Sequence, residues 1–141
     1  MEVINMEDLD VDEISKIVVD AAYHIHTTLG PGLLESVYEA VLAHELTKRG
    51  LEVNRQVPVE VVYDGITIGE GFRADMLVNG QLLIELKSVE RMQPVYFKQV
   101  RTYLKLMNLR VGLMFNFGAA TIKSGTTRVV NEYDGEFATR P

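Results

Sequence analysis

The chain of 141 residues contains no cysteine and no apolar run near the length of a membrane-spanning helix. Without cysteine it forms no disulfide, as is usual for proteins of a reducing compartment. A helix that crosses a bilayer needs roughly 20 consecutive apolar residues, so membrane insertion is excluded. The amino terminus also lacks the positive start and apolar core of a secretory signal. These absences together predict a cytoplasmic location.

The first 13 residues contain no base, and their six acids account for the net charge of -6 of the whole chain. The acids in this segment are Glu2, Glu7, Asp8, Asp10, Asp12 and Glu13. The rest of the chain is neutral, with 14 acids against 14 bases. This balance argues against strong nonspecific adhesion to DNA, but it leaves room for local basic patches that face phosphates and for an acidic metal site.

The composition is that of an ordinary globular protein, because 47% of the residues are hydrophobic and 24% are charged. We find no repeat and no low-complexity segment. A chain of this length is expected to form one domain, spanning residues 1–141. We place its core at about residues 25–131 and expect residues 1–9 and 132–141 to be flexible.

Helical periodicity dominates the first third of the chain. Apolar residues at helical spacing predict a helix from Val11 to about Leu29, with Asp10 as its N-cap. A second helix is predicted from about Leu33 to Arg49, and Gly50 stands where a left-handed residue closes a helix. The intervening Gly-Pro-Gly at 30–32 separates the two helices.

The period then changes to two, which predicts strands, and returns to helical spacing for one further helix. Asp64-Gly65 is a strong hairpin signal between the first two strands. The predicted elements are strands Val53–Tyr63, Ile66–Val78 and Leu82–Ser88, helix Gln93–Asn108, and strands Arg110–Asn116 and Thr127–Val130. This order predicts an α/β fold: a mixed central sheet of antiparallel hairpins plus a strand after a crossover helix, flanked by helices, with an extra N-terminal helix.

Three charged residues, Asp75, Glu85 and Lys87, interrupt apolar strands. An ionised side chain in a buried strand is costly unless a partner compensates it. With a two-residue turn at Asn79-Gly80, the apolar rows of the two strands would face opposite sides of the sheet. A three-residue loop aligns both apolar rows on one face and gathers the three charges on the other. Burial alone therefore predicts an acidic cluster.

Two carboxylates that converge on a sheet surface offer the hard oxygen ligands that Mg²⁺ and Mn²⁺ prefer. Such an ion activates water and stabilises charge on a phosphodiester under attack. Lys87, on the same face, would orient that water or neutralise the phosphate. The alternative is a solvated sheet face whose charges form weak cross-strand ion pairs.

The same residues carry a resemblance. Asp75, nine intervening residues and Glu85-Leu86-Lys87 resemble the signature of the PD-(D/E)XK nuclease superfamily, which has a restriction-endonuclease-like core. Residues 32–38 resemble the motif that names the GxxExxY family within it, and the Gln99 to Tyr103 element resembles that of RecB-like nucleases with a Holliday-junction-resolvase-like core. Further matches over residues 25–131 are Ala74–Val78, Tyr103–Lys105, Val111–Leu113 and Asn116–Gly118. Tyr96 is a departure, because many relatives are expected to have histidine there.

The resemblance implies a role for each site residue. Asp75 and Glu85 would bind the metal, Glu35 would be a supporting ligand, Lys87 would assist the nucleophile, and Gln99 would position water or phosphate. Glu39 is the rival of Glu35 for the helix position. Arg73 and Tyr103 are candidates for supporting or nucleic-acid contacts.

The leading functional hypothesis is a Mg²⁺- or Mn²⁺-dependent nuclease that hydrolyses phosphodiester bonds of DNA, with a homodimer as a candidate assembly. The alternative is a non-catalytic DNA-binding or oligomerisation module on the same fold. The sequence leaves open whether the substrate is DNA or RNA and whether cleavage is at ends, internal or at junctions.

Overall fold

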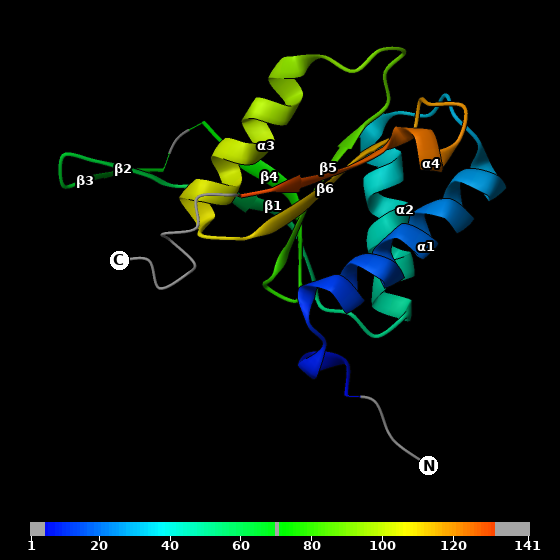
Figure 1. The fold of residues 1–141 in the computed structure, drawn as a ribbon, viewed down its shortest axis with the longest axis horizontal. Coiled ribbons are helices and arrows are strands. Elements are labelled where there is room, and N and C mark those ends of the chain that lie inside the picture. Colours follow the sequence, from blue (N-terminus) through cyan, green and yellow to red (C-terminus); the bar gives the residue numbers. More distant parts are fainter. Residues whose placement is uncertain (1–4, 70, 132–141) are drawn as a thin grey trace.

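The computed structural model describes residues 5–69 and 71–131 (Figure 1). Its elements in chain order are a 3-10 helix η1 (Met6–Asp8), α1 (Val11–Leu29), α2 (Glu35–Lys48), β1 (Val53–Pro58), β2 (Val61–Tyr63), β3 (Ile66–Ile68), β4 (Arg73–Val78), β5 (Leu82–Lys87), α3 (Pro94–Met107), β6 (Val111–Asn116), α4 (Ile122–Gly125) and β7 (Thr126–Val130). Within these residues no helix is both long and apolar enough to span a bilayer.

Five strands form the central sheet in the order β1-β4-β5-β6-β7. All neighbouring pairs are antiparallel except β5 and β6, which run parallel. A parallel pair needs a crossover connection, and α3 provides it between these two strands. The predicted α/β class is therefore confirmed, with the mixed sheet and flanking helices of a restriction-endonuclease-like core.

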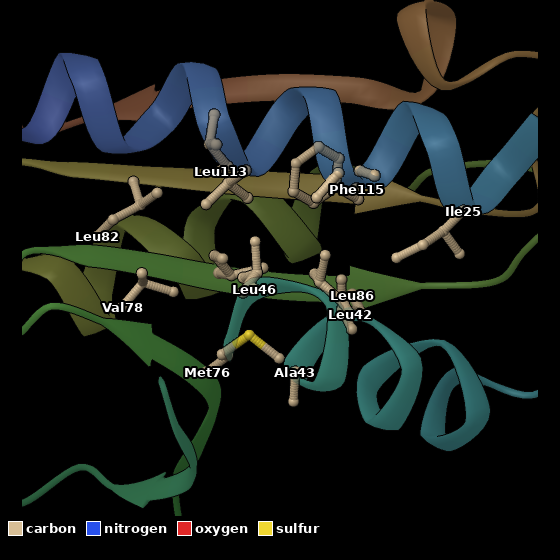
Figure 2. Packing of buried hydrophobic residues seen from close by; sticks show 14 of the residues in the cluster. Ile25, Leu42, Ala43, Leu46, Met76, Val78, Leu82, Leu86, Leu113 and Phe115 are labelled. Carbon is tan, nitrogen blue, oxygen red and sulfur yellow. The ribbon is translucent and has the colours of Figure 1, made fainter. Parts of the chain in front are cut away.

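Helices cover both faces of the sheet, with α1 and α2 on one side and α3 on the other (Figure 1). The larger apolar cluster joins α1 and α2 to the sheet, and Figure 2 shows side chains of α2 such as Leu42 and Leu46 beside Leu86 of β5. The smaller cluster packs α3, through Val100 and Leu104, on the opposite face. Burial on both faces explains why β5 and β6 read as continuous apolar runs.

The hairpin of β4 and β5 has the predicted three-residue loop. Its register pairs Met76 with Ile84 and Val78 with Leu82, which leaves residues 79–81 as the connection. Asn79 and Gly80 both adopt positive φ, at 51° and 64°, as tight hairpin loops require. Met76, Val78, Leu82 and Ile84 all belong to the larger cluster, so the predicted alignment of the apolar rows is confirmed from Met76 onward.

The first two predicted strands, Val53–Tyr63 and Ile66–Val78, are wrong as continuous elements. Each is broken, and β2 and β3 form a separate two-stranded sheet that projects from the body of the molecule (Figure 1). Pro58 has no N–H with which to extend the ladder, and Gly71 has a φ of 103° that ends the extended backbone. The Asp64-Gly65 turn between β2 and β3 is as predicted, with positive φ at both residues.

The described part of the N-terminal segment forms a short helix and contacts the loop between β4 and β5. Residues 1–4 and 132–141, parts of the segments expected to be flexible, lie outside the described residues, but Met6–Asp8 form η1. Asn79 Nδ2 donates to the carbonyl of Met6 at 3.0 Å, and Gln81 Nε2 donates to that of Leu9 at 3.1 Å. These bonds fix residues 6–9 on the loop between β4 and β5.

The N-cap of α1 was predicted correctly, whereas the short helix α4 was not predicted. Asp10 caps α1 as predicted, because its carboxylate accepts from Glu13 N at 2.8 Å while the Glu13 carboxylate accepts from Asp10 N at 3.0 Å. Helix α4 has only four residues, too few for a periodic pattern, and Thr121 caps it.

Candidate active site

Asp75 and Glu85 face each other across the hairpin of β4 and β5. The backbone N–H of Leu86 donates to Asp75 Oδ2 at 2.8 Å, and the backbone N–H of Asp75 donates to Glu85 Oε2 at 3.2 Å. Each carboxylate thus accepts a hydrogen bond from the opposite strand. These bonds hold both groups where the regular pairing of the two strands ends, at Met76 and Ile84.

The charge of Lys87 offsets the electrostatics of the carboxylate pair only in part. Burial, and then the neighbouring Asp75 carboxylate, raise the pKa of Glu85 to about 9. None of the ion pairs among the described residues includes Asp75 or Glu85. A cation between the two groups would relieve their repulsion, so the arrangement fits a bound metal ion.

Tyr103 of α3, a candidate for supporting contacts, lies within electrostatic range of this pair. Burial, and then the charges of Glu85 and Asp75, raise the pKa of its phenol. Gln99 lies one helical turn earlier, on the same side of α3, and its side chain is exposed. The structure therefore brings Tyr103 to the carboxylates and leaves Gln99 at the edge of the site, in contact with solvent.

Lys87 reaches toward α3, where its ammonium lies over the ring of Tyr96, with Nζ 4.3 Å from the ring centroid. In the described part of the chain it makes no ion pair with Asp75 or Glu85. The sequence comparison had marked Tyr96 only as a departure from histidine. Tyr96 lies three residues before Gln99 and seven before Tyr103, so all three residues lie on one side of α3. This spacing is the signal in the sequence that could have assigned Tyr96 to the site.

Asn116 locks the end of the strand that carries Lys87. In the register of β5 and β6 it lies opposite Lys87. Its amide accepts from Val89 N and donates to Val89 O, both at 3.0 Å, and Phe117 N donates to the carbonyl of Lys87 at 2.8 Å. A Cβ at Gly118 would lie 2.5 Å from the carbonyl of Val89, so only glycine fits. The Asn-Phe-Gly match thus has a structural explanation.

Glu35 begins α2 and is tied to the end of the same strand. Its Oε2 accepts from the backbone N–H of Ser88 at 3.3 Å, and the Ser88 hydroxyl donates to Leu33 O at 2.6 Å. However, the described residues contain no cluster of three acids or histidines able to hold a metal. The structure therefore places Glu35 beside the site and does not bring it together with Asp75 and Glu85 as a third direct ligand.

Tyr38 fixes the loop that precedes Glu35. Its hydroxyl donates to the carbonyl of Gly30 and accepts from Leu33 N at 3.2 Å. Its ring stacks on Phe117, with centroids 4.4 Å apart. The Gly-to-Tyr motif of residues 32–38 therefore anchors the start of α2 against the core.

Glu39, the rival of Glu35, has a structural role. It is buried, and its two oxygens accept from Arg55 Nε at 2.9 Å and Gln56 Nε2 at 2.8 Å. Gln56 adopts a φ of 51° in β1, opposite Asp75, and its carbonyl accepts from Arg73 Nη1 at 3.2 Å. Because both oxygens are occupied, Glu39 is not available as a metal ligand.

A large cavity lies elsewhere. It measures about 960 Å³, lies between α1 and β7, and shares no residue with the carboxylate pair. Its two acids are already paired, Asp12 with Arg128 and Asp20 with Arg49. It therefore offers no comparable chemistry.

Comparison with known proteins agrees with this geometry. A family model described as the PD-(D/E)XK nuclease superfamily matches residues 12–129. No curated protein and no solved structure gives a significant match. The matched range contains every residue that we have placed in or beside the site.

Proposed function

The chain belongs to the PD-(D/E)XK nuclease superfamily, and from this premise we propose that it hydrolyses phosphodiester bonds of DNA with the help of Mg²⁺ or Mn²⁺. Nucleases of this superfamily generally use divalent metal ions. The observation that carries the proposal is the Asp75 and Glu85 pair, held by backbone hydrogen bonds from opposite strands and forming no ion pair among the described residues. The GxxExxY family is the branch that residues 32–38 favour.

The donor set suits these ions. Asp75 and Glu85 provide two hard oxygen ligands, and ions of this kind complete their coordination with water and phosphate oxygens. When bound, the ion supplies electrostatic stabilisation of the charge that builds on the phosphate during hydrolysis. Metal binding also requires that Glu85 lose its proton, because a protonated carboxyl is a poor ligand.

Lys87 is the group we assign to the nucleophile. Its ammonium, resting on the Tyr96 ring, donates hydrogen bonds either to the attacking water or to a non-bridging phosphate oxygen. Tyr103 presents a hydroxyl donor beside the carboxylates. Gln99, exposed at the rim, positions water or phosphate from the solvent side.

We assign Glu35 an indirect role, in which it contacts the metal ion through a water molecule. Since it accepts a hydrogen bond from Ser88 N, its second oxygen is oriented by the strand that carries Lys87. A water held by that oxygen would complete the shell of an ion bound to Asp75 and Glu85. Glu35 thus supports the site through a water molecule, as the resemblance to the GxxExxY motif suggests.

The test is cleavage of linear, circular and branched DNA by the purified protein with Mg²⁺ or Mn²⁺. We expect Asp75→Asn and Lys87→Met to lose about 10²-fold or more of the activity, since each removes a group that acts on the reacting atoms. Lys123→Met is the matched control, because Lys123 is an exposed lysine of α4. Cleavage that persists in Lys87→Met would show a contaminating nuclease and would remove the support for our assignment.

The β2 and β3 hairpin favours a second candidate, an oligomerisation module that forms a homodimer. Val62, Tyr63 and Ile66 are 67%, 73% and 62% exposed, an unusual apolar surface for a projecting ribbon. Residues 59–69 carry acids and no base, whereas a groove beside β7 is lined by Arg101 and by Arg128, which also pairs with Asp12. Light scattering of the wild type and Tyr63→Ser tests this, and a wild type that is monomeric at all concentrations excludes it.

A further inference from the structure

A pocket of about 300 Å³ lies beside the start of β4, the strand that carries Asp75. It is lined by Pro58, Gly69, Gly71, Phe72 and Arg73. Its volume is at the lower end of those that bind small ligands, and suits one planar aromatic ring. Nothing in the proposed cleavage chemistry uses this pocket, although Arg73 is only two residues from Asp75.

Phe72 connects the pocket to the carboxylates. Its ring packs at a 60° angle on Tyr103, with centroids 5.8 Å apart, and the charges of Glu85 and Asp75 in turn act on the phenol of Tyr103. The tilted contact leaves Phe72 40% exposed, which is unusual for a phenylalanine. An uncovered aromatic face thus borders the candidate active site.

Two of the residues that line the pocket are glycines, Gly69 and Gly71. Gly71 has a φ of 103°, which residues with a side chain rarely adopt. A Cβ built at Gly69 or Gly71 meets no atom within 4 Å, so the space beside them is open. A flat ligand can approach the backbone of these two glycines closely.

Arg73 adds a positive charge to the same pocket. Its Nη1 donates to the carbonyl of Gln56 at 3.2 Å, which anchors one end of the guanidinium, and the side chain is exposed. A guanidinium has five N–H donors, so an anchored arginine still presents several to an anion. An aromatic face, a proline and a guanidinium together recognise a planar ring that is joined to an anionic group.

We propose that this pocket is a subsite for one unpaired base of a DNA strand, which stacks on Phe72 while Arg73 contacts the adjoining phosphate. The inference rests on the proposed function, because it takes Asp75 and Glu85 as the place of the scissile phosphate. Two residues of extended strand span about 6.6 Å, comparable with one nucleotide step along a backbone. A base inside a duplex cannot enter a side pocket, so the preferred substrate is single-stranded DNA or a frayed end.

The charge of the protein supports stacking as the main source of affinity. The net charge of -6 gives no general attraction to DNA, and among the described residues that line the pocket Arg73 is the only base. Stacking on an aromatic side chain tolerates any base, so sequence preference is expected to be weak. Salt dependence is expected to be shallow for the same reason.

The experiment is fluorescence anisotropy with labelled DNA of about 12 nucleotides, single-stranded or as a blunt duplex, in EDTA so that cleavage does not interfere. Phe72→Leu keeps an apolar contact with Tyr103 but removes the aromatic face, and should weaken single-strand binding by about 5- to 100-fold. Arg73→Gln should weaken it and flatten its salt dependence. Tyr23→Leu is the matched control, because Tyr23 is 58% exposed on α1.

Three results would overturn the subsite. The wild type could prefer the blunt duplex, or it could bind neither DNA. The third result is an unchanged single-strand affinity in a Phe72→Leu variant that melts like the wild type. Its failure is separable from failure of the nuclease. Cleavage by the wild type with unchanged binding by Phe72→Leu refutes only the subsite. Selective loss of binding in Phe72→Leu, with no cleavage by the wild type, supports the subsite and refutes the nuclease.

Discussion

Lys87 Nζ lies 4.3 Å from the centroid of the Tyr96 ring, so the ammonium that we assign to the nucleophile rests on an aromatic face instead of pairing with Asp75 or Glu85. A cation over an aromatic ring is stabilised by roughly 0.5–2 kcal/mol, depending on solvent exposure. The contact holds the ammonium against α3, from where its charge still acts on Glu85.

The first prediction concerns Tyr96. Tyr96→Leu removes the ring and should lower kcat about 3- to 30-fold with little change in KM, because the ammonium loses its resting position. Tyr96→Phe keeps the ring and should retain most of the activity. Single-turnover kinetics measure both. Equal losses in the two variants would indicate that the hydroxyl, and not the ring, is what matters.

The second prediction is a pH dependence of stability set by Glu85. Its pKa in the folded protein is about 9, against 4.5 for an ordinary glutamate, so between these values the folded state holds a proton that the unfolded chain has released. Stability from this group is complete below about pH 4.5 and is lost as pH rises to about 9. Glu85→Gln should therefore be more stable than the metal-free wild type at about pH 8, by on the order of 1–3 kcal/mol.

Glu45 provides a control of opposite sign. A hydrogen bond from Arg49 is the main cause that lowers its pKa, so its stabilisation is present above the unfolded value and is lost as pH falls. Glu45→Gln should thus be less stable than the wild type at neutral pH, and the difference should shrink in acid. Thermal melts of both variants across pH check the pair. Parallel curves for Glu85→Gln and the wild type would contradict the second prediction.

The third prediction concerns metal binding in the absence of DNA. Mn²⁺ at about 100 times its dissociation constant should stabilise the wild type by about 2.7 kcal/mol. For a protein of this size that corresponds to a rise in Tm of roughly 5–10 °C. Asp75→Asn should abolish the rise, whereas Asp12→Asn, at an ion pair on the other face, should keep it. The same rise in both variants would place the metal elsewhere.

The fourth prediction separates Glu35 from Glu39. Glu39→Gln weakens its bonds with Arg55 and Gln56, and should lower the free energy of unfolding by about 1–3 kcal/mol while leaving the Mn²⁺ response intact. Glu35→Gln alters an exposed residue and should leave stability nearly unchanged while reducing cleavage. Denaturant unfolding and cleavage rates of both variants test this. The prediction is contradicted if Glu39→Gln is as stable as the wild type or if Glu35→Gln cleaves at the wild-type rate.

Much of this site was predictable from the alternation of apolar residues. The rows that include Met76 and Ile84 must face one layer, which requires the three-residue loop at 79–81. Asp75 and Glu85 lie directly beyond the last pair of this register. No knowledge of chemistry was needed for that step. The helices followed equally directly, because α1 and α3 each bury one apolar stripe.

Other features depend on backbone geometry that periodicity does not encode. The φ of 51° at Gln56 turns its side chain toward Glu39 and so decides which glutamate of α2 is structural. Breaks near Pro58 and Gly71 separate the β2 and β3 hairpin from strands that read as continuous. The contact between Lys87 and Tyr96 joins two elements whose relative placement only the folded chain defines.

The most direct test of the central claim is anomalous diffraction from crystals of the protein soaked in Mn²⁺. The site described here predicts an anomalous peak between the carboxylates of Asp75 and Glu85, within about 2.0–2.3 Å of an oxygen of each, and no peak there in Asp75→Asn. A well-occupied Mn²⁺ peak elsewhere, with the two carboxylates still bonded only to each other's strand, would contradict it.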